Sequence, residues 1–182
     1  MIKGSKVILR EKRLEDAWND YAWKKDPDLA GLDATLPLDL PFSMYLLSYA
    51  EELNHNDGRG YTYAIETLEG EHIGNCSYYN IDRDKGEAEL GIIIGDTAYW
   101  NAGYGTDAAT ALVNYVFEKE GLKRMYLHTL VRNSRAQKCF QKCGFVPCGC
   151  VARSGYDFIL MEMKKPKASS DRDSAGGLDS SV

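Results

Sequence analysis

The sequence predicts a single α/β domain with a mixed, mostly antiparallel central sheet flanked by helices. Between Tyr61 and Ile94, three segments of strand-like composition follow one another with short turns, which is typical of an antiparallel meander. A helical period over Gly105–Glu120 then leads into another strand-like run, and the order strand, helix, strand predicts a parallel crossover. The chain has 182 residues, 44% of them hydrophobic, which is enough for one domain with its own core.

The N-terminal part of the chain is expected to hold one strand, two helices and a long loop. Lys6–Arg10 has the composition of a strand, and Leu14–Asp26 carries apolar residues at helical spacing. Pro27–Pro41 contains three prolines and a glycine, so we expect a long irregular loop of the kind that often shapes a binding site. A second helix is predicted over Ser43–Leu53, with Ser43 as its N-cap.

The meander strands are assigned from their composition and their turns. Tyr61–Leu68 and His72–Ile81 flank a short turn and predict a hairpin, and Ala88–Ile94 predicts the third strand. The helix over Gly105–Glu120 keeps its apolar residues on one stripe and ends at Gly121.

The C-terminal part is expected to add three strands and one short helix. Arg124–Leu130 predicts a strand, and Asn133–Gly144 predicts a helix that Gly144 terminates. Phe145–Ala152 and Tyr156–Met163 predict two strands that pair with each other. Residues 166–182 are small and polar without an apolar period, so we expect a disordered tail after a domain that spans residues 1–165.

Charge and hydropathy restrict the classes of partner. The formal net charge is −5 and no block of Lys and Arg occurs in the domain, which argues against a nucleic-acid partner. No apolar run approaches the ~18 to 20 residues of a membrane span, and the first residues lack the apolar region of a signal peptide. We therefore expect a cytoplasmic protein that has no membrane partner.

The five cysteines do not have the usual spacing of zinc ligands. They are Cys76, Cys139, Cys143, Cys148 and Cys150, an odd number that includes a CxxxC pair and a CxC pair. We expect buried or half-buried free thiols and no metal site.

The segment Tyr99–Asp107, which reads YWNAGYGTD, has the outline of a phosphate-binding loop. It lies between a predicted strand and the start of a predicted helix, where backbone N–H groups and the helix dipole favour an anion. Gly103 and Gly105 leave no Cβ between a ligand and the backbone. A tight loop that needs glycine for its own conformation is the alternative interpretation.

A second motif gives the loop a family context. YWNAGYGTDA is followed, after a helix and a strand, by VRNSRAQKCFQKCGF, and together they resemble the GNAT superfamily of acetyl-CoA-dependent N-acetyltransferases. The family signatures are Q/R-x-x-G-x-G/A and, roughly, N-x-x-A-x-x-x-Y-x-K-x-G-F. The matching residues are Gly103, Gly105, Asn133, Ala136, Lys142, Gly144 and Phe145. The resemblance covers about residues 5–165 and looks closest to the RimJ/RimL-like branch, because of the opening strand with its charged helix and the WNAGYGTDA form of the loop.

The resemblance implies the GNAT fold, with acetyl-CoA as co-substrate and a set of residues that bind it. Backbone groups of Ile92, Ile93 and Ile94 would pair with the pantetheine arm as another strand does. The pyrophosphate would be wrapped by Trp100, Asn101, Ala102, Gly103, Tyr104, Gly105 and Thr106. Asn133 would bond the pantetheine or seat the acetyl group, although it could simply cap a helix, and Phe140 would lie near the sulfur. A Rossmann dinucleotide site is disfavoured, since the loop lacks the third glycine and follows a meander.

Acetyl transfer to an amine requires a base, because a lysine-like amine is mostly protonated at neutral pH. Glu89 is the candidate: its distance from Gly103 matches the catalytic glutamate of the histone-acetylating GNATs, and its side chain alternates with Leu90. Glu87 lies on the same face, and Glu66 is a more distant candidate. A structural ion pair is the alternative role for Glu89.

The reaction also needs a proton for the leaving thiolate of CoA. Many GNATs supply it from a tyrosine in the second signature, but this chain has Phe140 at that position, which has no proton to give. Either the thiolate leaves unaided, or Tyr78, Tyr79 or Tyr156 serves as acid, or the protein is a poor catalyst. A covalent acetyl-cysteine at Cys139 or Cys143 is disfavoured against direct attack. Ordinary surface or packing roles are expected for His55, His72 and His128.

We therefore expect an N-acetyltransferase that modifies a primary amine by direct attack with general-base help. The acceptor would be a protein N-terminus or a small cationic amine such as a polyamine or an aminoglycoside. The acceptor wall would be built by the 27–41 loop and the second helix, with Asp33, Asp39, Tyr45 and Tyr49 available. The alternative is a non-catalytic acyl-CoA-binding or interaction module, motivated by Phe140. A homodimer is left open by the exposed edges expected of a meander.

Overall fold

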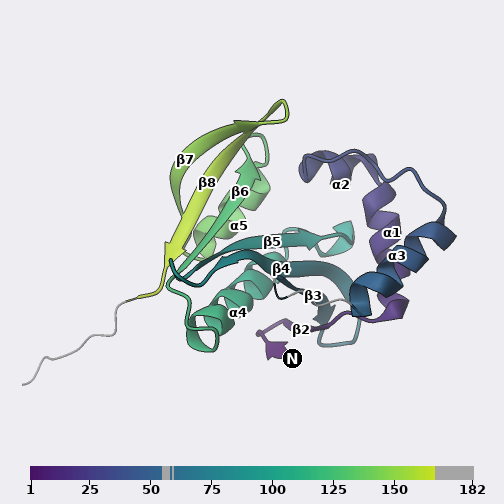
Figure 1. Ribbon diagram of the computed structural model, residues 1–182, viewed down its shortest axis with the longest axis horizontal. Helices are drawn as coiled ribbons and strands as arrows, with labels where there is room; N and C mark the ends of the chain where they lie inside the picture. The colour runs from purple at the N-terminus through teal and green to yellow at the C-terminus, as the bar shows by residue number, and fades with distance from the viewer. Residues whose placement is uncertain (55–57, 59, 167–182) are drawn as a thin grey trace, which may run out of the picture.

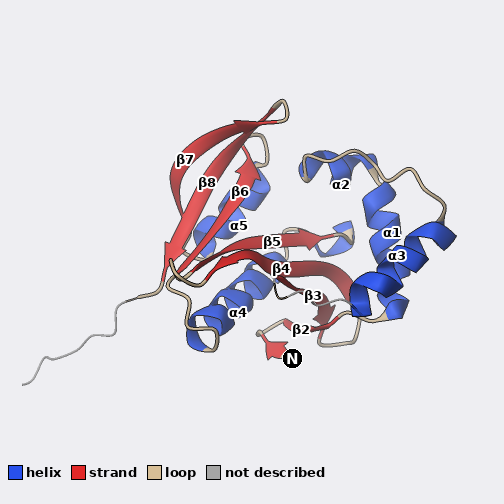
Figure 2. Ribbon diagram, viewed as in Figure 1, coloured by secondary structure: helices blue, strands red, loops and turns tan. Residues whose placement is uncertain are grey.

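An eight-stranded mixed sheet organises the molecule (Figure 1, Figure 2). The computed structural model describes residues 1–54, 58 and 60–166. The strand order is β1-β2-β3-β4-β5-β6-β8-β7, and every neighbouring pair is antiparallel except β5 and β6. The predicted sheet type, including the parallel crossover, is confirmed.

The predicted strands occur with boundaries shifted by one or two residues at most. The strands are β1 Ile2–Lys3, β2 Val7–Glu11, β3 Gly60–Thr67, β4 His72–Asp82, β5 Glu87–Ile94, β6 Arg124–Leu130, β7 Val146–Arg153 and β8 Tyr156–Lys164. Only the two-residue β1 was not predicted, because a strand that short carries no period.

The helices are η1 Leu14–Asp16, α1 Ala17–Lys25, α2 Pro27–Leu32, α3 Phe42–Asn54, η2 Thr97–Tyr99, α4 Tyr104–Glu118 and α5 Ser134–Lys142. The prediction of an irregular loop over 27–41 is wrong at its start, where α2 forms. The carboxylate of Asp26 accepts hydrogen bonds from the N–H groups of Asp28 (2.8 Å) and Leu29 (3.1 Å). Pro27 occupies the first turn, where its fixed φ and missing N–H favour a helix start.

The N-cap predicted for α3 is also wrong. Ser43 lies inside the helix, since Phe42 is already helical. The N–H groups of Met44 and Tyr45 both donate to the carbonyl oxygen of Pro41, at 3.1 Å. The helix therefore begins one residue before the serine that resembled a cap.

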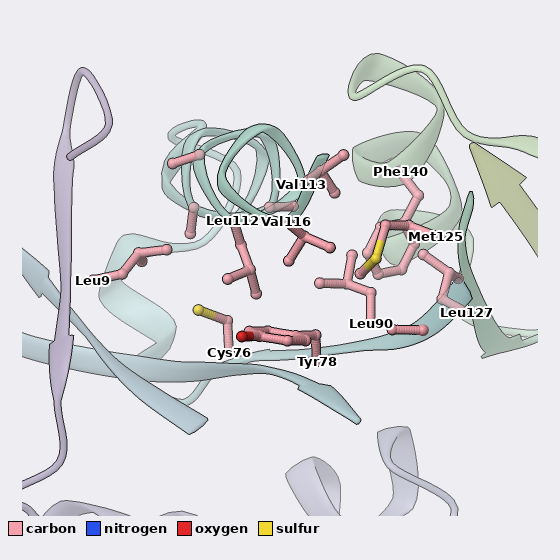
Figure 3. Packing of buried hydrophobic residues seen from close by; sticks show 14 of the residues in the cluster. Leu9, Cys76, Tyr78, Leu90, Leu112, Val113, Val116, Met125, Leu127 and Phe140 are labelled. Carbon is pink, nitrogen blue, oxygen red and sulfur yellow. The ribbon is translucent and has the colours of Figure 1, made fainter. Parts of the chain in front are cut away.

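Helix α4 packs across one face of the sheet and supplies much of the core. Figure 3 shows Leu112 and Val116 of α4 pointing toward Cys76 and Tyr78 on the sheet, with Val113 on the side of the helix nearer Phe140. Leu112 is fully buried, and truncating such a leucine to alanine costs about 2–5 kcal/mol. Phe140 of α5 completes the same cluster, so α4 and α5 are held on one side of the sheet.

Strands β5 and β6 separate soon after they begin, and this separation positions the site. They pair only at Glu87 with Arg124, Ala88 with Met125 and Glu89 with Tyr126. Beyond this point β6 continues beside β8 and β5 continues beside β4 (Figure 1). Among the described residues, no strand therefore pairs with the β6 side of β5 from Leu90 to Ile94.

A second, smaller cluster of buried residues joins α1 to α3. Tyr45 and Tyr49 are 7% and 6% exposed and pack with Ala17. Because both rings are buried against α1, the prediction that they face an acceptor is wrong. Their burial follows from the i,i+4 spacing, which puts both on the inner face of α3.

The cysteine prediction holds for three of the five thiols. Cys76 is buried, and Cys139 and Cys143 are half-buried, but Cys148 and Cys150 are exposed. These two lie on β7, an edge strand whose residues are all exposed.

The tail predicted to be disordered lies outside the described residues from position 167 onward, and His55 lies outside them too. Within the described part of the chain, no helix combines the length and the apolarity needed to cross a membrane.

Candidate functional site

A pocket of about 410 Å³ opens where β5 ends. Its walls are the end of β5, the loop after it, the first turn of α4, one face of α5 and the end of α2. Every predicted cofactor residue except Ala102 lines it: Ile92, Ile93, Ile94, Trp100, Asn101, Gly103, Tyr104, Gly105, Thr106, Asn133 and Phe140. Two segments that are about 30 residues apart in sequence therefore meet in one cavity, as the two signatures require.

The backbone on the open edge of β5 can pair with an extended ligand. The N–H of Gly95 donates to the carbonyl of Ile73 at 2.9 Å, so by antiparallel alternation Ile93 also faces β4. The backbone groups of Ile92 and Ile94 then point toward the gap beside β6. The carbonyl of Ile94 already accepts from the indole Nε1 of Trp100 at 2.7 Å. Ile92 is thus the residue whose N–H and C=O both face the gap, and the backbone role predicted for Ile93 lacks support.

The glycine-bearing loop ends at the first turn of α4. Gly103 is the residue before the helix and has φ +88°, a conformation that costs glycine little. Intrahelical bonding begins with Asp107, whose N–H donates to Gly103 at 3.0 Å. The N–H groups of Tyr104, Gly105 and Thr106 therefore have no partner within the helix, as at any helix start. These N–H groups and the helix dipole together favour a phosphate in the pocket.

Gly105 keeps this part of the pocket open. A Cβ placed there would lie 3.5 Å from Cγ1 of Ile94 and 3.6 Å from Sγ of Cys139, which are ordinary contacts. An alanine would therefore fit the fold, and its methyl group would occupy space near the free N–H groups.

Cationic side chains of α5 add positive charge to the pocket. Arg135, Lys138 and Lys142 line it, and the Arg135 guanidinium stacks 3.1 Å above the ring centre of Trp100. A guanidinium and two ammonium groups beside free N–H groups suit an anionic ligand. Lys142 was named from the sequence only as part of the second signature, and Arg135 and Lys138 were not identified, although the spacing of three and four along one helix was a usable signal.

Asn133 and Phe140 have structural contacts as well as places in the pocket. The side-chain oxygen of Asn133 accepts from the N–H of Ala136 at 3.1 Å, so the helix-cap interpretation is confirmed. The Phe140 ring is 6% exposed and meets Phe145 edge to face at 5.9 Å.

Two thiols of α5 lie against the first turn of α4. Sγ of Cys139 is 3.4 Å from Oγ1 of Thr106, and Sγ of Cys143 donates to the Thr106 carbonyl at 3.5 Å. The adjacent Cys143 thiol, followed by Thr106 and the charges of Lys142 and Arg135, lowers the pKa of Cys139 to about 6. Burial and the adjacent Cys139 sulfur raise the pKa of Cys143.

Glu89 lies at the point where β5 and β6 separate, and both its carboxylate oxygens are hydrogen-bonded. Oε1 is 2.7 Å from Nδ1 of His128, and Oε2 accepts from Nδ2 of Asn80 at 2.9 Å. Asn80 reaches it from a bulge in β4, where it has φ +50°. The side chain faces away from Leu90, which is in the core, as predicted. Glu89 is 7% exposed and does not itself line the pocket.

The packing role expected for His128 therefore omitted its contact with Glu89. The two residues are 39 positions apart, and only the register of β5 against β6 brings them together. A strand histidine and a strand glutamate carry no joint signal in the sequence.

The other two carboxylates considered as bases are engaged in ion pairs. Glu87 accepts from Nη1 of Arg124 at 2.6 Å, and Glu66 pairs with Nε of Arg10. Both are held by guanidinium groups, which stay protonated in proteins.

The three tyrosines considered as acids differ in position. Tyr78 is 1% exposed and lies in the core under α4, so its candidacy is wrong (Figure 3). Tyr156 is half-buried on β8, with the Arg132 guanidinium 5.8 Å from its ring. Tyr79 is on the same face as Glu89, and its ring crosses Gly91, since Cε1 would lie 3.1 Å from a Cβ on that glycine. Partial burial and the charge of Glu89 raise the pKa of Tyr79, which keeps its phenol protonated.

Helix α2 forms the wall opposite α5. Leu29, Leu32 and Asp33 contribute to the pocket, and the carbonyl of Gly31 accepts from Nη2 of Arg132 at 2.7 Å. The charge of Asp33 also contributes to the raised pKa of Tyr79. Asp39 is exposed and does not line the pocket.

Within the described residues, no group of three or more His, Cys, Asp or Glu side chains is placed to hold a metal ion.

An unpaired strand edge, a helix start with free N–H groups and a cationic helix face define an enzyme class that binds an extended, phosphorylated acyl carrier. The model of the acetyltransferase (GNAT) domain matches residues 6–146, and the chain belongs to that family. It is an acetyl-CoA-dependent N-acetyltransferase with the GNAT fold.

Relatives of known sequence and structure agree with this assignment. The chain is 25% identical over 142 residues to the uncharacterized N-acetyltransferase p20 of Bacillus licheniformis, covering 77% of this chain and 79% of the relative. A crystal structure of spermidine N-acetyltransferase from Vibrio cholerae, in complex with CoA and spermine, superposes with a TM-score of 0.77 at 21% identity over 88% of this chain and 96% of the other. Aminoglycoside acetyltransferase AAC(6')-Ib, in complex with coenzyme A, gives 0.72 at 20% identity over 87% and 95%. At these identities, the two structures show a shared fold.

Proposed function

We propose that the enzyme acetylates a small amine that carries more than one positive charge, such as a polyamine or an aminoglycoside. The observation that carries the proposal is the acidic character of the acceptor side: Glu89 lies where the strands separate, and Asp33 stands on the pocket wall near Tyr79. A carboxylate on the pocket wall and a second one at the strand separation favour a cationic acceptor. The structural similarity to a spermidine N-acetyltransferase and to an aminoglycoside acetyltransferase supports the same substrate class.

In this proposal acetyl-CoA fills the pocket along the open edge of β5. The pantetheine arm would pair with the backbone of Ile92, and the pyrophosphate would lie against the N–H groups of Gly105 and Thr106. Asn133 would contribute its side-chain nitrogen, which has no partner among the described residues. The acetyl group would then point along β5 toward Glu89.

Catalysis requires a neutral amine, and we propose that general-base function depends on Glu89. The amine of a polyamine is mostly protonated at pH 7, so its proton must leave before the lone pair can attack the thioester carbonyl. Glu89 is the described carboxylate at the strand separation that is not paired with an arginine.

Tyr79 is the proposed acid for the leaving thiolate. Its ring crosses Gly91 on the face that carries Glu89, which aims it toward the open edge of β5. The phenol would replace the hydroxyl that Phe140 lacks. We expect Tyr79→Phe to lower kcat and to remove the alkaline limb of its pH profile. Full turnover with an unchanged alkaline limb in this variant would exclude the role.

The experiment that tests the function is a thiol-release assay with acetyl-CoA over polyamines, aminoglycosides and peptides with free N-termini. We expect release of CoA with at least one polyamine or aminoglycoside and no release with the peptides. Turnover with the peptides alone would replace the proposed acceptor by a protein N-terminus. Acetyl-CoA binding by calorimetry without CoA release across the whole panel would favour a non-catalytic acyl-CoA-binding module.

Three further predictions remain proposals. Membership of the RimJ/RimL-like branch rests on the WNAGYGTDA loop and the charged first helix. A homodimer is proposed from the exposed edge strand β7, and light scattering of the purified protein tests it. The cytoplasmic location is tested by fractionating the cells that produce the protein.

A further inference from the structure

The geometry points to Nε2 of His128 as the atom that takes the proton of the acceptor amine, with Glu89 as the residue that positions His128. This inference rests on the proposed acetylation of an amine and assigns the proton transfer to a different atom. Histidine was expected to have only a packing or surface role in this chain.

The first argument is that the carboxylate of Glu89 is fully engaged. Oε1 is 2.7 Å from Nδ1 of His128 and Oε2 is 2.9 Å from Nδ2 of Asn80, so each oxygen already has a donor. The Glu89 side chain is 10% exposed against 17% for His128, and neither residue lines the pocket. A carboxylate with both oxygens hydrogen-bonded can orient the neighbouring imidazole, but it has little freedom to accept a proton from the substrate amine.

The second argument is the state of the imidazole. With Glu89 ionised, Nδ1 carries the proton and donates it to Oε1, which leaves the lone pair on Nε2. Nε2 has no hydrogen-bond partner among the described residues. In the described part of the chain, the buried side-chain atom that lacks a hydrogen-bond partner is Nδ1 of His72. Nε2 of His128 also lacks a partner among the described residues but is not that atom, so it is not buried. Nε2 is therefore both free and reached by solvent, on a side chain that is 17% exposed.

The third argument is the charge around the ring. Tyr126 of β6 and Phe158 of β8 meet His128 edge to face, with ring centres 6.1 Å and 6.4 Å away. Burial, followed by the charge of Glu89, raises the pKa of Tyr126, so that phenol stays neutral. Arg153 covers Phe158 at 5.6 Å from its ring centre. The charge in direct contact with the imidazole is the carboxylate of Glu89 on β5, which stabilises an imidazolium.

The fourth argument is position. Tyr126 is the last residue of β6 that pairs with β5, and His128 is two residues further along the same face. It therefore stands where the two strands have begun to separate, about 7 Å beyond their last pair. The open edge of β5 faces this gap, so a thioester seated along that edge and Nε2 approach the same space.

The proton and electron balance is straightforward. Nε2 removes one proton from the ammonium, which gives a neutral amine and an imidazolium whose Nδ1–H stays bonded to Glu89. The amine lone pair forms the C–N bond to the acetyl carbonyl, and the C–S bond breaks with its electron pair moving to sulfur. A second proton lost from nitrogen is balanced by the proton that the CoA thiolate gains, and the imidazolium returns its proton to solvent.

The test compares two substitutions that replace different atoms of the ring. In His128→Asn, the side-chain nitrogen can replace Nδ1 and donate a hydrogen bond to Glu89. The variant has no atom at the position of Nε2. In His128→Gln a nitrogen can reach the place of Nε2, but an amide is not a base. Both variants are expected to lose about 10²- to 10³-fold in kcat with an unchanged Kd for acetyl-CoA. The inflection on the acidic side of kcat/KM should disappear in both.

A second acceptor separates base catalysis from a merely structural role. An O-alkylhydroxylamine or hydrazide analogue of the accepted amine is already neutral at pH 7 and needs no base. We expect the loss in His128→Asn to shrink at least tenfold with this analogue. Asp84→Ala, an exposed carboxylate change in the turn between β4 and β5 and outside the pocket, serves as control and should behave as wild type with both acceptors.

Three results would overturn the inference. One is a His128→Asn variant that keeps more than half of kcat while Glu89→Gln loses turnover, which would make Glu89 the proton acceptor itself. Another is an equal loss with the neutral acceptor, and the third is a weakened Kd for acetyl-CoA. In each of these cases the wild-type enzyme still acetylates the amine, and only the role of His128 is excluded. If the proposed function itself were wrong, the wild-type enzyme would show no turnover.

Discussion

Removing the carboxylate of the half-buried Asp107 should destabilise the domain, because that carboxylate binds three backbone N–H groups. Asp107 is in the first turn of α4, and its carboxylate accepts hydrogen bonds from three consecutive N–H groups that end at the first residue of β2. The donors are Ser5 at 2.9 Å, Lys6 at 2.8 Å and Val7 at 3.1 Å. One side chain thus ties the first turn of α4, whose N–H groups are proposed to bind the pyrophosphate, to the N-terminal strands.

The magnitude follows from what the three donors lose in Asp107→Ala. Val7 is fully buried, so its N–H cannot turn to water, and an unsatisfied buried donor costs about 1–3 kcal/mol. Ser5 and Lys6 are exposed and can be hydrated, so each of their bonds adds only about 0.5 kcal/mol. The total of about 2–4 kcal/mol corresponds to a fall in Tm of roughly 5 to 15 °C for a domain of this size.

The assay is thermal unfolding followed by circular dichroism, with Asp39→Ala as the matched control. Asp39 is exposed and has no hydrogen bond or ion pair within the described residues, so its loss should change stability by less than about 0.5 kcal/mol. A fall in Tm below 2 °C in Asp107→Ala, or one equal to the control, would refute the reasoning.

Three further predictions concern the pocket and the buried charges. Cys139 should react with iodoacetamide along a pH profile centred near 6, with protection by acetyl-CoA; a midpoint near the ordinary thiol value of ~8.5 would contradict this. Gly105→Ala should keep its Tm, since the methyl group makes only ordinary contacts, yet bind acetyl-CoA at least tenfold more weakly; unchanged binding would place the pyrophosphate elsewhere. Burial lowers the pKa of His72, so folding should lose stability as pH falls below ~6.5, the value for an unfolded histidine. Urea midpoints at pH 7.5 and 5.5 should differ less in His72→Gln than in wild type, and an equal difference would exclude His72 as the cause.

The features that the sequence predicts well are those that depend on local pattern. The strands follow from alternation and turns, and the two signatures place both walls of the pocket because each is a contiguous segment. Glu89 was found in the same way, from its fixed distance to the loop in one strand and turn. Local chemistry was misjudged at α2, where Asp26 and Pro27 form a good helix start but the number of prolines suggested a loop.

The features that cannot be predicted from the sequence depend on how elements that are distant along the chain pack together. His128 and Asn80 contact Glu89 through the register of β6 and a bulge in β4, and neither can be read from one segment. Tyr45 and Tyr49 are aromatic residues on a helix beside the acceptor side, yet their burial against α1 decides their role. Pairing across strands is therefore the information that a single sequence lacks here.

The most direct test of the account is to measure acetyl-CoA binding and amine-dependent CoA release in wild type and in Glu89→Gln. The account predicts release by the wild type with a polyamine or aminoglycoside. It also predicts at least about a 100-fold lower kcat in the variant, because the carboxylate that positions His128 at the strand separation is lost, with an unchanged Kd for acetyl-CoA. Equal kcat in the two proteins would contradict the central claim that the Glu89 site removes the proton of the amine.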